Sequence, residues 1–256
     1  MQKSDSRQLT TIADHADGVL RTAEIADYDN AVNGLQVEND GCVTKIAAAV
    51  DASVKTVRLA AERGADLLVV HHGIFWPGLR PICGPFRELL KIAFEHNIAI
   101  YAAHIPLDVH SELGNNALLM RALRIENSQP FFDWKNVQLG QRAAVTLSRE
   151  ELTTRLHQLF GSEMKIVAAG SQNVRSVGVI TGGAGSEIFE IAKLGIDTFI
   201  TGEAPHWAAV AAHDLKINFF VAGHYATEVF GVRALASHLS ERFGIPHEFI
   251  DCPTGF

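Results

Sequence analysis

The sequence is poor in cysteine, with three residues among 256, and these stand far apart at Cys42, Cys83 and Cys252. None of them forms a Cys-x-x-Cys pair, so the chain lacks the common thiolate zinc motif and the common dithiol redox motif. The odd number also argues against a framework of disulfides. We therefore expect three reduced thiols and a functional site built from other side chains.

The chain also lacks a long apolar run and an excess of positive charge. No stretch approaches the roughly 20 apolar residues of a membrane span, and the opening segment MQKSDSRQLTTIADHADG has no signal-peptide core. We expect a cytoplasmic protein with no membrane partner. The net charge of −7 argues against a nucleic-acid partner and favours a small-molecule substrate, while 47% hydrophobic residues suffice for a sizeable core.

Strand and helix signals alternate in the first half of the chain. Short apolar runs without helical spacing favour buried parallel strands, and the segments between them space apolar residues as a helix does. Ser53 is a plausible N-cap for the first of these helices, and Gly64 a plausible stop. The expected βαβαβ order is strand 45–51, helix 53–64, strand 65–72, helix 84–97 and strand 98–104. The second helix is predicted to present one apolar face: Phe86, Leu89, Leu90, Ala93 and Phe94.

The same order of elements returns in the second half of the chain. The expected elements are strand 175–182, helix 185–195, strand 196–203, helix 204–214 and strand 216–224. A shift of 131 residues places the pair His71-His72 on Gly202-Glu203, and a shift of 120 residues places His104 on His224. The loop WPGLRPICG in the first copy accounts for the 11-residue difference. Such weak similarity can also arise by chance between α/β segments.

The remaining segments complete an α/β protein. Between the copies we predict a helix over 112–125, a turn-rich connection at FFDWKN, and a strand RAAVTLS before a helix with the capping box Ser148 and Glu151. A strand KIVAAG follows, and a long amphipathic helix succeeds the second copy. We predict two similar, interlocked α/β lobes, residues 1–125 and 126–256, with no inserted domain; the first can also receive the C-terminal segment.

Metal-ligand side chains end three of the predicted strands. They are His71 with His72, His104 with Asp108, and His224 with Glu228, and the last two pairs share the spacing His-x-x-x-carboxylate. Parallel α/β sheets bind ligands at the carboxyl ends of their strands, where all of these residues fall. Imidazoles and carboxylates without thiolate suit zinc, iron, manganese, nickel or cobalt. The pattern predicts a site for two divalent metal ions between the lobes.

Each of these residues also has a structural explanation. A single histidine at a strand end is commonly a hydrogen-bonded structural residue, and Asp108 or Glu228 alone can be a helix cap or a solvated side chain. Glu203 and His206 stand near the second copy's equivalent of the histidine pair, so they are candidates for orienting ligands or contacting substrate. The segment GGAG at 182–185 can cradle an anion or simply form a tight turn.

Several motifs together resemble a known family. NGLQV at 33–37, HHGIFW at 71–76, HIPLDVHSELGNN at 104–116, TGE at 201–203 and GHYATEVFGVRAL at 223–235 are similar to the dinuclear-metal-centre family known as GTP cyclohydrolase type 2 homologues, in its short bacterial, YbgI-type form. The resemblance covers nearly the whole chain. It implies two similar α/β lobes and a homohexamer built as a trimer of dimers.

The resemblance also implies a set of ligands for the two ions. They are His71, His72, Asp108, His224 and Glu228, with Glu228 bridging the ions, while His104 matches a histidine that lines the site. We expect a hydrolase in which a metal-bound hydroxide attacks a small substrate, with a nucleotide as one candidate. His104 or His206 is a candidate for proton transfer to the leaving group. The alternative is a hexameric metal-binding scaffold or metal-handling protein that catalyses no reaction.

Overall fold

The structure is a computed structural model, and it describes residues 7–256. These residues form two compact units, each of which draws on two separate stretches of chain. The first unit holds the described residues up to Leu107 together with Gly231–Cys252, and the second holds Asp108–Phe230 and Pro253–Phe256. The division into lobes 1–125, which can also receive the C-terminal segment, and 126–256 stays a prediction.

The first unit is built on a five-stranded sheet with the order β1-β4-β3-β2-β11. Neighbouring strands from β4 to β11 run parallel, and β1 is antiparallel to β4 at the edge. The strands are β1 (Gly34–Val37), β2 (Ile46–Asp51), β3 (Leu67–His72), β4 (Ala99–Ala102) and β11 (His247–Phe249). The helices are α2 (Leu9–Leu20), α3 (Val54–Glu62), α4 (Gly84–Glu95), the start of the short α5 (Ile105–Asp108) and the later part of α10 (His224–Phe243).

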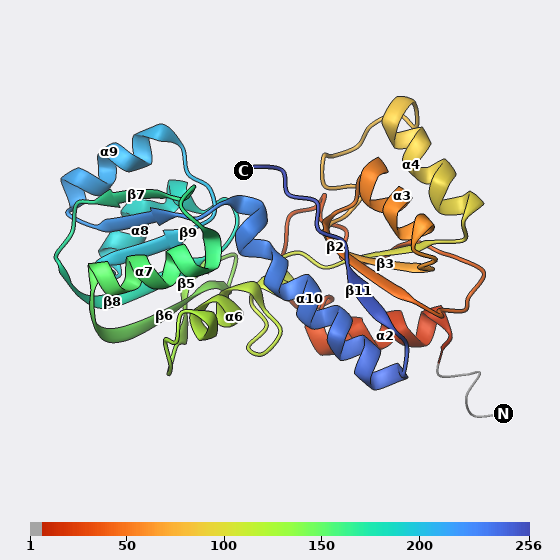
Figure 1. Ribbon diagram of the computed structural model, residues 1–256, viewed down its shortest axis with the longest axis horizontal. Helices are drawn as coiled ribbons and strands as arrows, with labels where there is room; N and C mark the ends of the chain where they lie inside the picture. The colour runs from red at the N-terminus through yellow and green to blue at the C-terminus, as the bar shows by residue number, and fades with distance from the viewer. Residues whose placement is uncertain (1–6) are drawn as a thin grey trace. The chain divides into compact units, whose positions relative to one another are not determined.

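Helices cover both faces of this sheet. In Figure 1, α3 and α4 lie on one face, and α2 and α10 lie on the other. The first face packs Ala47, Leu68 and Ile100 against Val57 and Leu89, all at most 2% exposed. Because apolar side chains of β3 are buried on both faces, its sequence is a continuous apolar run, LLVV, before the histidines.

The predicted βαβαβ order is confirmed in the first unit as β2, α3, β3, α4 and β4. Ser53 caps α3 as expected, because its hydroxyl accepts a hydrogen bond from the backbone N–H of Thr56. The predicted apolar face of α4 is buried only in part, since Phe94 is 66% exposed. The buried stripe of α4 consists of Phe86, Leu89 and Ala93, so Phe94 lies beyond its edge.

The second unit is built on a six-stranded sheet with the order β5-β6-β8-β9-β10-β7. Strands β8, β9 and β10 are parallel, while β6 and β7 pair with them in antiparallel fashion. The strands are β5 (Gln129–Trp134), β6 (Val137–Ser148), β7 (Lys165–Ala168), β8 (Asn173–Ile180), β9 (Thr198–Thr201) and β10 (Asn218–Val221). The helices are α6 (Asn115–Ala122), α7 (Arg149–Phe160), η1 (Gly185–Glu187), α8 (Ile188–Lys193), α9 (His206–Leu215) and the start of α10.

The segment FFDWKN is a strand and a tight turn, so its prediction as a turn-rich connection is wrong. Residues up to Trp134 belong to β5, which pairs with β6 in a hairpin whose last pair is Trp134 and Val137. The turn residues Lys135 and Asn136 have φ of 49° and 64°. Positive φ at both central residues matches the right-handed twist of a two-residue hairpin, so the short KN turn leaves the aromatic residues free to form a strand.

The two units share a run of β, α, β, α and β elements, but their strands are not offset by one constant number. Pairing begins at Leu67 and Ala99 in the first unit, and at Thr198 and Asn218 in the second. The β3-to-β9 offset is therefore 131 residues, as predicted, whereas the β4-to-β10 offset is 119. His224 thus lies one residue farther past its strand than His104 does. Among the helices within residues 7–256, none combines the length and apolar character that crossing a membrane requires.

Candidate metal-binding residues

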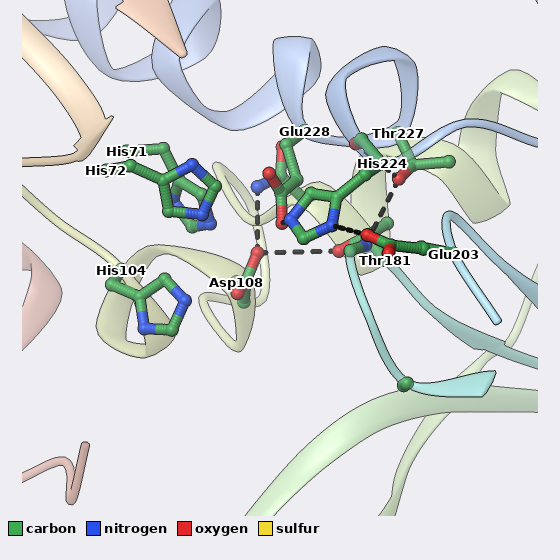
Figure 2. A network of polar contacts seen from close by, with 12 residues as sticks. His71, His72, His104, Asp108, Thr181, Glu203, His224, Thr227 and Glu228 are labelled. Carbon is green, nitrogen blue, oxygen red and sulfur yellow. Dashed lines mark hydrogen bonds and ion pairs between the residues drawn. The ribbon is translucent and has the colours of Figure 1, made fainter. Parts of the chain in front are cut away.

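Three imidazoles of the first unit meet at the carboxyl edge of its sheet. His71 and His72 are the last residues of β3, and His104 follows β4 two residues after that strand ends. These residues are 1%, 7% and 8% exposed, and one nitrogen from each ring lies within 4.8 Å of the others (Figure 2). The rings of His71 and His72 have centroids 4.8 Å apart although the residues are adjacent in a strand. The end of β3 therefore brings both rings to one place.

Each of these rings is held through its Nδ1 atom by an oxygen acceptor. Nδ1 of His71 donates to the carbonyl oxygen of Ala103 at 2.8 Å, and Nδ1 of His72 donates to Oδ1 of Asp51 at 2.9 Å. Nδ1 of His104 donates to Oδ1 of Asp27 at 2.8 Å. A carbonyl or an ionised carboxylate only accepts, so the ring proton is on Nδ1 and Nε2 of the neutral ring carries the basic lone pair. This arrangement is typical of metal-binding histidines.

Asp27 is kept ionised by the groups around it. Burial alone raises the pKa of the Asp27 carboxyl, but the hydrogen bond and charge of His104, with further bonds from Asn33 and the backbone N–H of Tyr28, lower the pKa below its ordinary value. The second carboxylate oxygen also accepts from the backbone N–H of Ile105 at 2.9 Å. Asp27 thus ties a loop before β1 to the segment that carries His104.

The second unit places a histidine and a carboxylate one turn apart on a helix. His224 is the first residue of α10, and its Nε2 lies 3.2 Å from Oε1 of Glu228, which is 2% exposed. Nδ1 of His224 donates to Oε2 of Glu203 at 2.8 Å. Burial lowers the pKa of His224, but the bonds and charges of Glu228 and Glu203 outweigh it and raise the pKa to about 9. A metal ion held by His224 and Glu228 would take the place of the proton that they share.

A glycine turn at the end of β8 makes room for this carboxylate. A Cβ atom on Gly182 would lie 2.3 Å from Oε1 of Glu228, and the φ of Gly182 is +68°. Its carbonyl oxygen accepts from the backbone N–H groups of Gly202 and Glu203, both at 2.9 Å, and its own N–H donates to Thr227. The start of the predicted GGAG motif is therefore a bend that packs against the ligand-bearing helix.

Two buried asparagines hold Asp108. Oδ1 of Asp108 accepts from Nδ2 of Asn115 at 2.8 Å, and Thr181 donates to the same oxygen at 3.4 Å. Asn116 donates to the backbone carbonyl of Asp108 and accepts from the backbone N–H of Thr181. Figure 2 shows the side chains of Asp108, Glu228 and His224 pointing toward one another within the second unit. The motif HSELGNN thus fixes this carboxylate next to the end of β8.

The structure also places the residues predicted for supporting roles. Glu203 orients the ring of His224 and is itself 54% exposed at its side chain. His206 is exposed at the first residue of α9, and its predicted role stays a prediction. Sequence reasoning missed Asp51 and Asp27. Asp51 ends β2 beside β3, which was a usable signal, whereas Asp27 lies in an irregular loop that offers no pattern.

Comparison with known proteins identifies the family. The model of Duf34/NIF3, NGG1p interacting factor 3, matches residues 7–254 of the chain. The chain belongs to the Duf34/NIF3 family. The resemblance inferred from the sequence motifs is thereby confirmed.

Similar proteins match over nearly their full length. A GTP cyclohydrolase 1 type 2 homolog of Deinococcus radiodurans is 44% identical over 231 residues, covering 89% of this chain and 87% of that protein. A homolog of the same name from Pseudomonas aeruginosa is 38% identical over 248 residues, or 96% of this chain and 97% of that protein. The chain therefore spans the length of these Duf34/NIF3 relatives.

Solved structures share the fold. The protein TTHA1606 from Thermus thermophilus is 37% identical with a TM-score of 0.88, covering 97% of this chain and 100% of that one. The protein ybgI, described as of unknown function, is 35% identical with a TM-score of 0.88 over 97% and 100% of the two chains. The arrangement of sheets and helices described above is thus a Duf34/NIF3 fold.

Proposed function

We propose that this Duf34/NIF3 protein is a hydrolase that depends on two divalent metal ions and acts on a small molecule, with a nucleotide as one candidate. The proposed ligands are His71, His72, Asp108, His224 and Glu228, with Glu228 shared by both ions. The first unit would supply the histidine pair and the second unit the carboxylates. A single centre built in this way needs donors from both units.

One observation carries the proposal: all four histidines bind an oxygen acceptor through Nδ1. The acceptors are the carbonyl oxygen of Ala103 and the carboxylates of Asp51, Asp27 and Glu203. Such contacts fix the tautomer, aim Nε2 and raise its basicity, and losing one typically lowers metal affinity 10- to 100-fold. A histidine buried for packing alone has no need of this uniform arrangement.

The donor set fits borderline divalent ions. Imidazole nitrogen and carboxylate oxygen without thiolate suit zinc, iron, manganese, nickel or cobalt. When bound, two such ions would lower the pKa of a water molecule toward neutrality and polarise the substrate oxygen under attack. The residues of the chain then have to hold the ions, orient the substrate and deliver a proton.

The pair of Asp27 and His104 is our candidate for holding that proton. His104 lies beside the histidine pair, with ring centroids 4.9 Å from His71 and 5.6 Å from His72. The carboxylate of Asp27 accepts from Nδ1 of His104 and orients the ring, so Nε2 is the atom that would deliver the proton. His206, exposed on α9, is the less favoured candidate.

Metal analysis and a substrate panel test the proposal. Protein purified without chelator should contain close to two divalent ions per chain by elemental analysis, and should hydrolyse a member of a panel of nucleotides, phosphoesters and amides. The variant Glu228→Gln should fold, lose metal and lose turnover. Trace metal in the wild-type protein would contradict the proposal. Full metal occupancy without turnover of any panel member would instead favour the non-catalytic metal-binding scaffold.

We also propose that the two units derive from one duplicated βαβαβ unit and that the chain forms a homohexamer. The common order of elements supports the duplication. Large apolar side chains that are exposed together in the single chain support association: Leu79, Ile82 and Phe94. Light scattering during size-exclusion chromatography checks the second point, and a monomer at micromolar concentration would refute it.

A further inference from the structure

We propose that Trp76 is a positioning residue for two histidines of the first unit, the candidate ligand His72 and the proton-transfer candidate His104. This inference rests on the proposed metal site. The indole of Trp76 stacks on His72, with centroids 5.1 Å apart and planes 20° apart. The same indole lies 4.2 Å from the ring of His104. One aromatic side chain therefore contacts two of the three imidazoles.

The backbone around Trp76 is held so that the indole faces these rings. The backbone N–H of Trp76 donates to the carbonyl oxygen of Gly73 at 3.2 Å, which forms a turn directly after β3. The carbonyl of Trp76 accepts from the side-chain amide of Asn30. The ring of Tyr28 meets the indole edge-on at 5.9 Å. Trp76 is thus held both by the turn after β3 and by the loop that carries Tyr28 and Asn30.

The same loop fixes His104 and Trp76. Asp27 accepts from Nδ1 of His104, and Asn30, three residues later, donates to Trp76. The ring of Tyr28, between them, lies 6.1 Å from the ring of His104. The loop therefore sets the position of the indole relative to the imidazole, and a shift of either would disturb both contacts.

A hydrogen bond at Nδ1 does not fully fix an imidazole. It sets where one corner of the ring lies, but the ring can still tilt about that bond and move Nε2 away from an ion. The indole packed on His72 and against His104 restricts this tilt. Its electron-rich face also favours an imidazole that has given electron density to a cation, in the way that aromatic rings attract cations. Both effects raise metal affinity.

Cobalt titration tests the role, because bound Co²⁺ absorbs visible light in a way that depends on coordination geometry. The full chain and the variants Trp76→Leu and Trp76→Phe are titrated with Co²⁺ by absorbance and with Zn²⁺ by calorimetry. We expect Trp76→Leu to weaken binding about 10- to 100-fold, as loss of other supporting contacts does, and to change the Co²⁺ spectrum. Trp76→Phe keeps a ring and should recover much of the affinity.

A surface tryptophan provides the matched control. Trp207 on α9 is 46% exposed and stacks on Phe189 at 6.0 Å, so Trp207→Leu loses an indole stack that contacts no candidate ligand. Trp207→Leu should keep the metal affinity of the wild-type protein within about twofold and leave the Co²⁺ spectrum unchanged. Circular dichroism reports whether each variant folds. If Trp76→Leu does not fold, the metal affinity and Co²⁺ spectrum of Trp76→Phe decide the result.

Two outcomes overturn the inference in different ways. If the wild-type protein binds metal and both folded Trp76 variants keep its affinity within about twofold with an unchanged spectrum, Trp76 has no positioning role, and the metal site stands. If the wild-type protein binds neither Co²⁺ nor Zn²⁺, the proposed function fails and this inference fails with it.

Discussion

The candidate ligands of the two units differ in kind although they follow the same order of elements. The first unit offers three imidazoles, two of them from the end of β3. The second unit offers one imidazole and two carboxylates, and its equivalent of the histidine pair is Gly202 and Glu203. The strand-end position that supplies a ligand in one unit supplies an orienting carboxylate in the other. The same order of elements can thus present different side chains at its strand ends.

Removing one imidazole from the first unit should have the largest effect. His72→Ala removes a candidate ligand, and we expect metal affinity to fall by more than about 100-fold, with occupancy dropping from two ions toward one. His96→Ala, at an exposed histidine after α4, is the control. Elemental analysis and calorimetry give the result, and an unchanged metal content in His72→Ala would remove this residue from the ligand set.

Neutralising an orienting carboxylate should affect both units alike. Asp51→Asn in the first unit and Glu203→Gln in the second each keep the shape but weaken the acceptor for Nδ1 of a histidine. We expect metal affinity to fall about 10- to 100-fold in each. Glu190→Gln, at an exposed glutamate paired with Lys193, should change nothing. Calorimetric titration gives the metal affinity of each variant. An unchanged affinity in one of them would mean that the carboxylate of that unit does not position its histidine.

The glycine turn can be tested by comparing two glycines of the second unit. Gly182 and Gly195 have φ of +68° and +79°, but a Cβ on Gly182 meets Glu228 whereas a Cβ on Gly195 meets nothing within 4 Å. Gly195→Ala should lower the free energy of unfolding by about 1 kcal/mol through backbone strain alone. Gly182→Ala should lower it by about 1–3 kcal/mol and also weaken metal binding. Equal losses in urea unfolding would show that the carboxylate moves aside freely.

The smallest effect concerns a histidine pair of the first unit that lies outside the site. Nε2 of His15 lies 2.9 Å from Nε2 of His238, and burial, His238 and Arg242 together lower the pKa of His15. The unfolded chain therefore binds a proton more readily, so stability from this pair is present above about pH 6.5 and is lost as the pH falls toward the folded pKa. Because His15 is only partly buried, solvent screens its charge and we expect a loss below about 1 kcal/mol.

Comparing the pH dependence of stability in the wild-type protein and in His15→Gln separates the contribution of His15 from that of other titrating groups. His15→Gln should lose less stability between pH 7.5 and 5.5 than the wild-type protein does, as measured by urea unfolding at both pH values. An identical loss in both proteins would mean that the pair does not control acid stability.

Sequence patterns anticipated the strand ends better than the supporting contacts. Short apolar runs located β3 and β4, and the residues after them were recognised as candidate ligands because sheets gather such positions at one edge. Asp27 could not be found in this way, since its contact with His104 spans 77 residues and depends on how a loop folds back. Strand β5 was missed because the turn in the segment FFDWKN is confined to Lys135 and Asn136, which adopt positive φ, and the aromatic residues before them pair with β6.

The chain passes between the two units three times, after Leu107, within α10 at Phe230 and after Cys252. A gene cut after Leu107 or after Phe230 would divide the first unit between two fragments. A peptide ending at Leu107 would lack β11, which pairs with β2, and Leu239, which is 1% exposed in the whole protein. It would therefore present an open sheet edge and bare apolar surface, both of which promote aggregation. We expect the two units to melt in one transition and to resist separation by limited proteolysis.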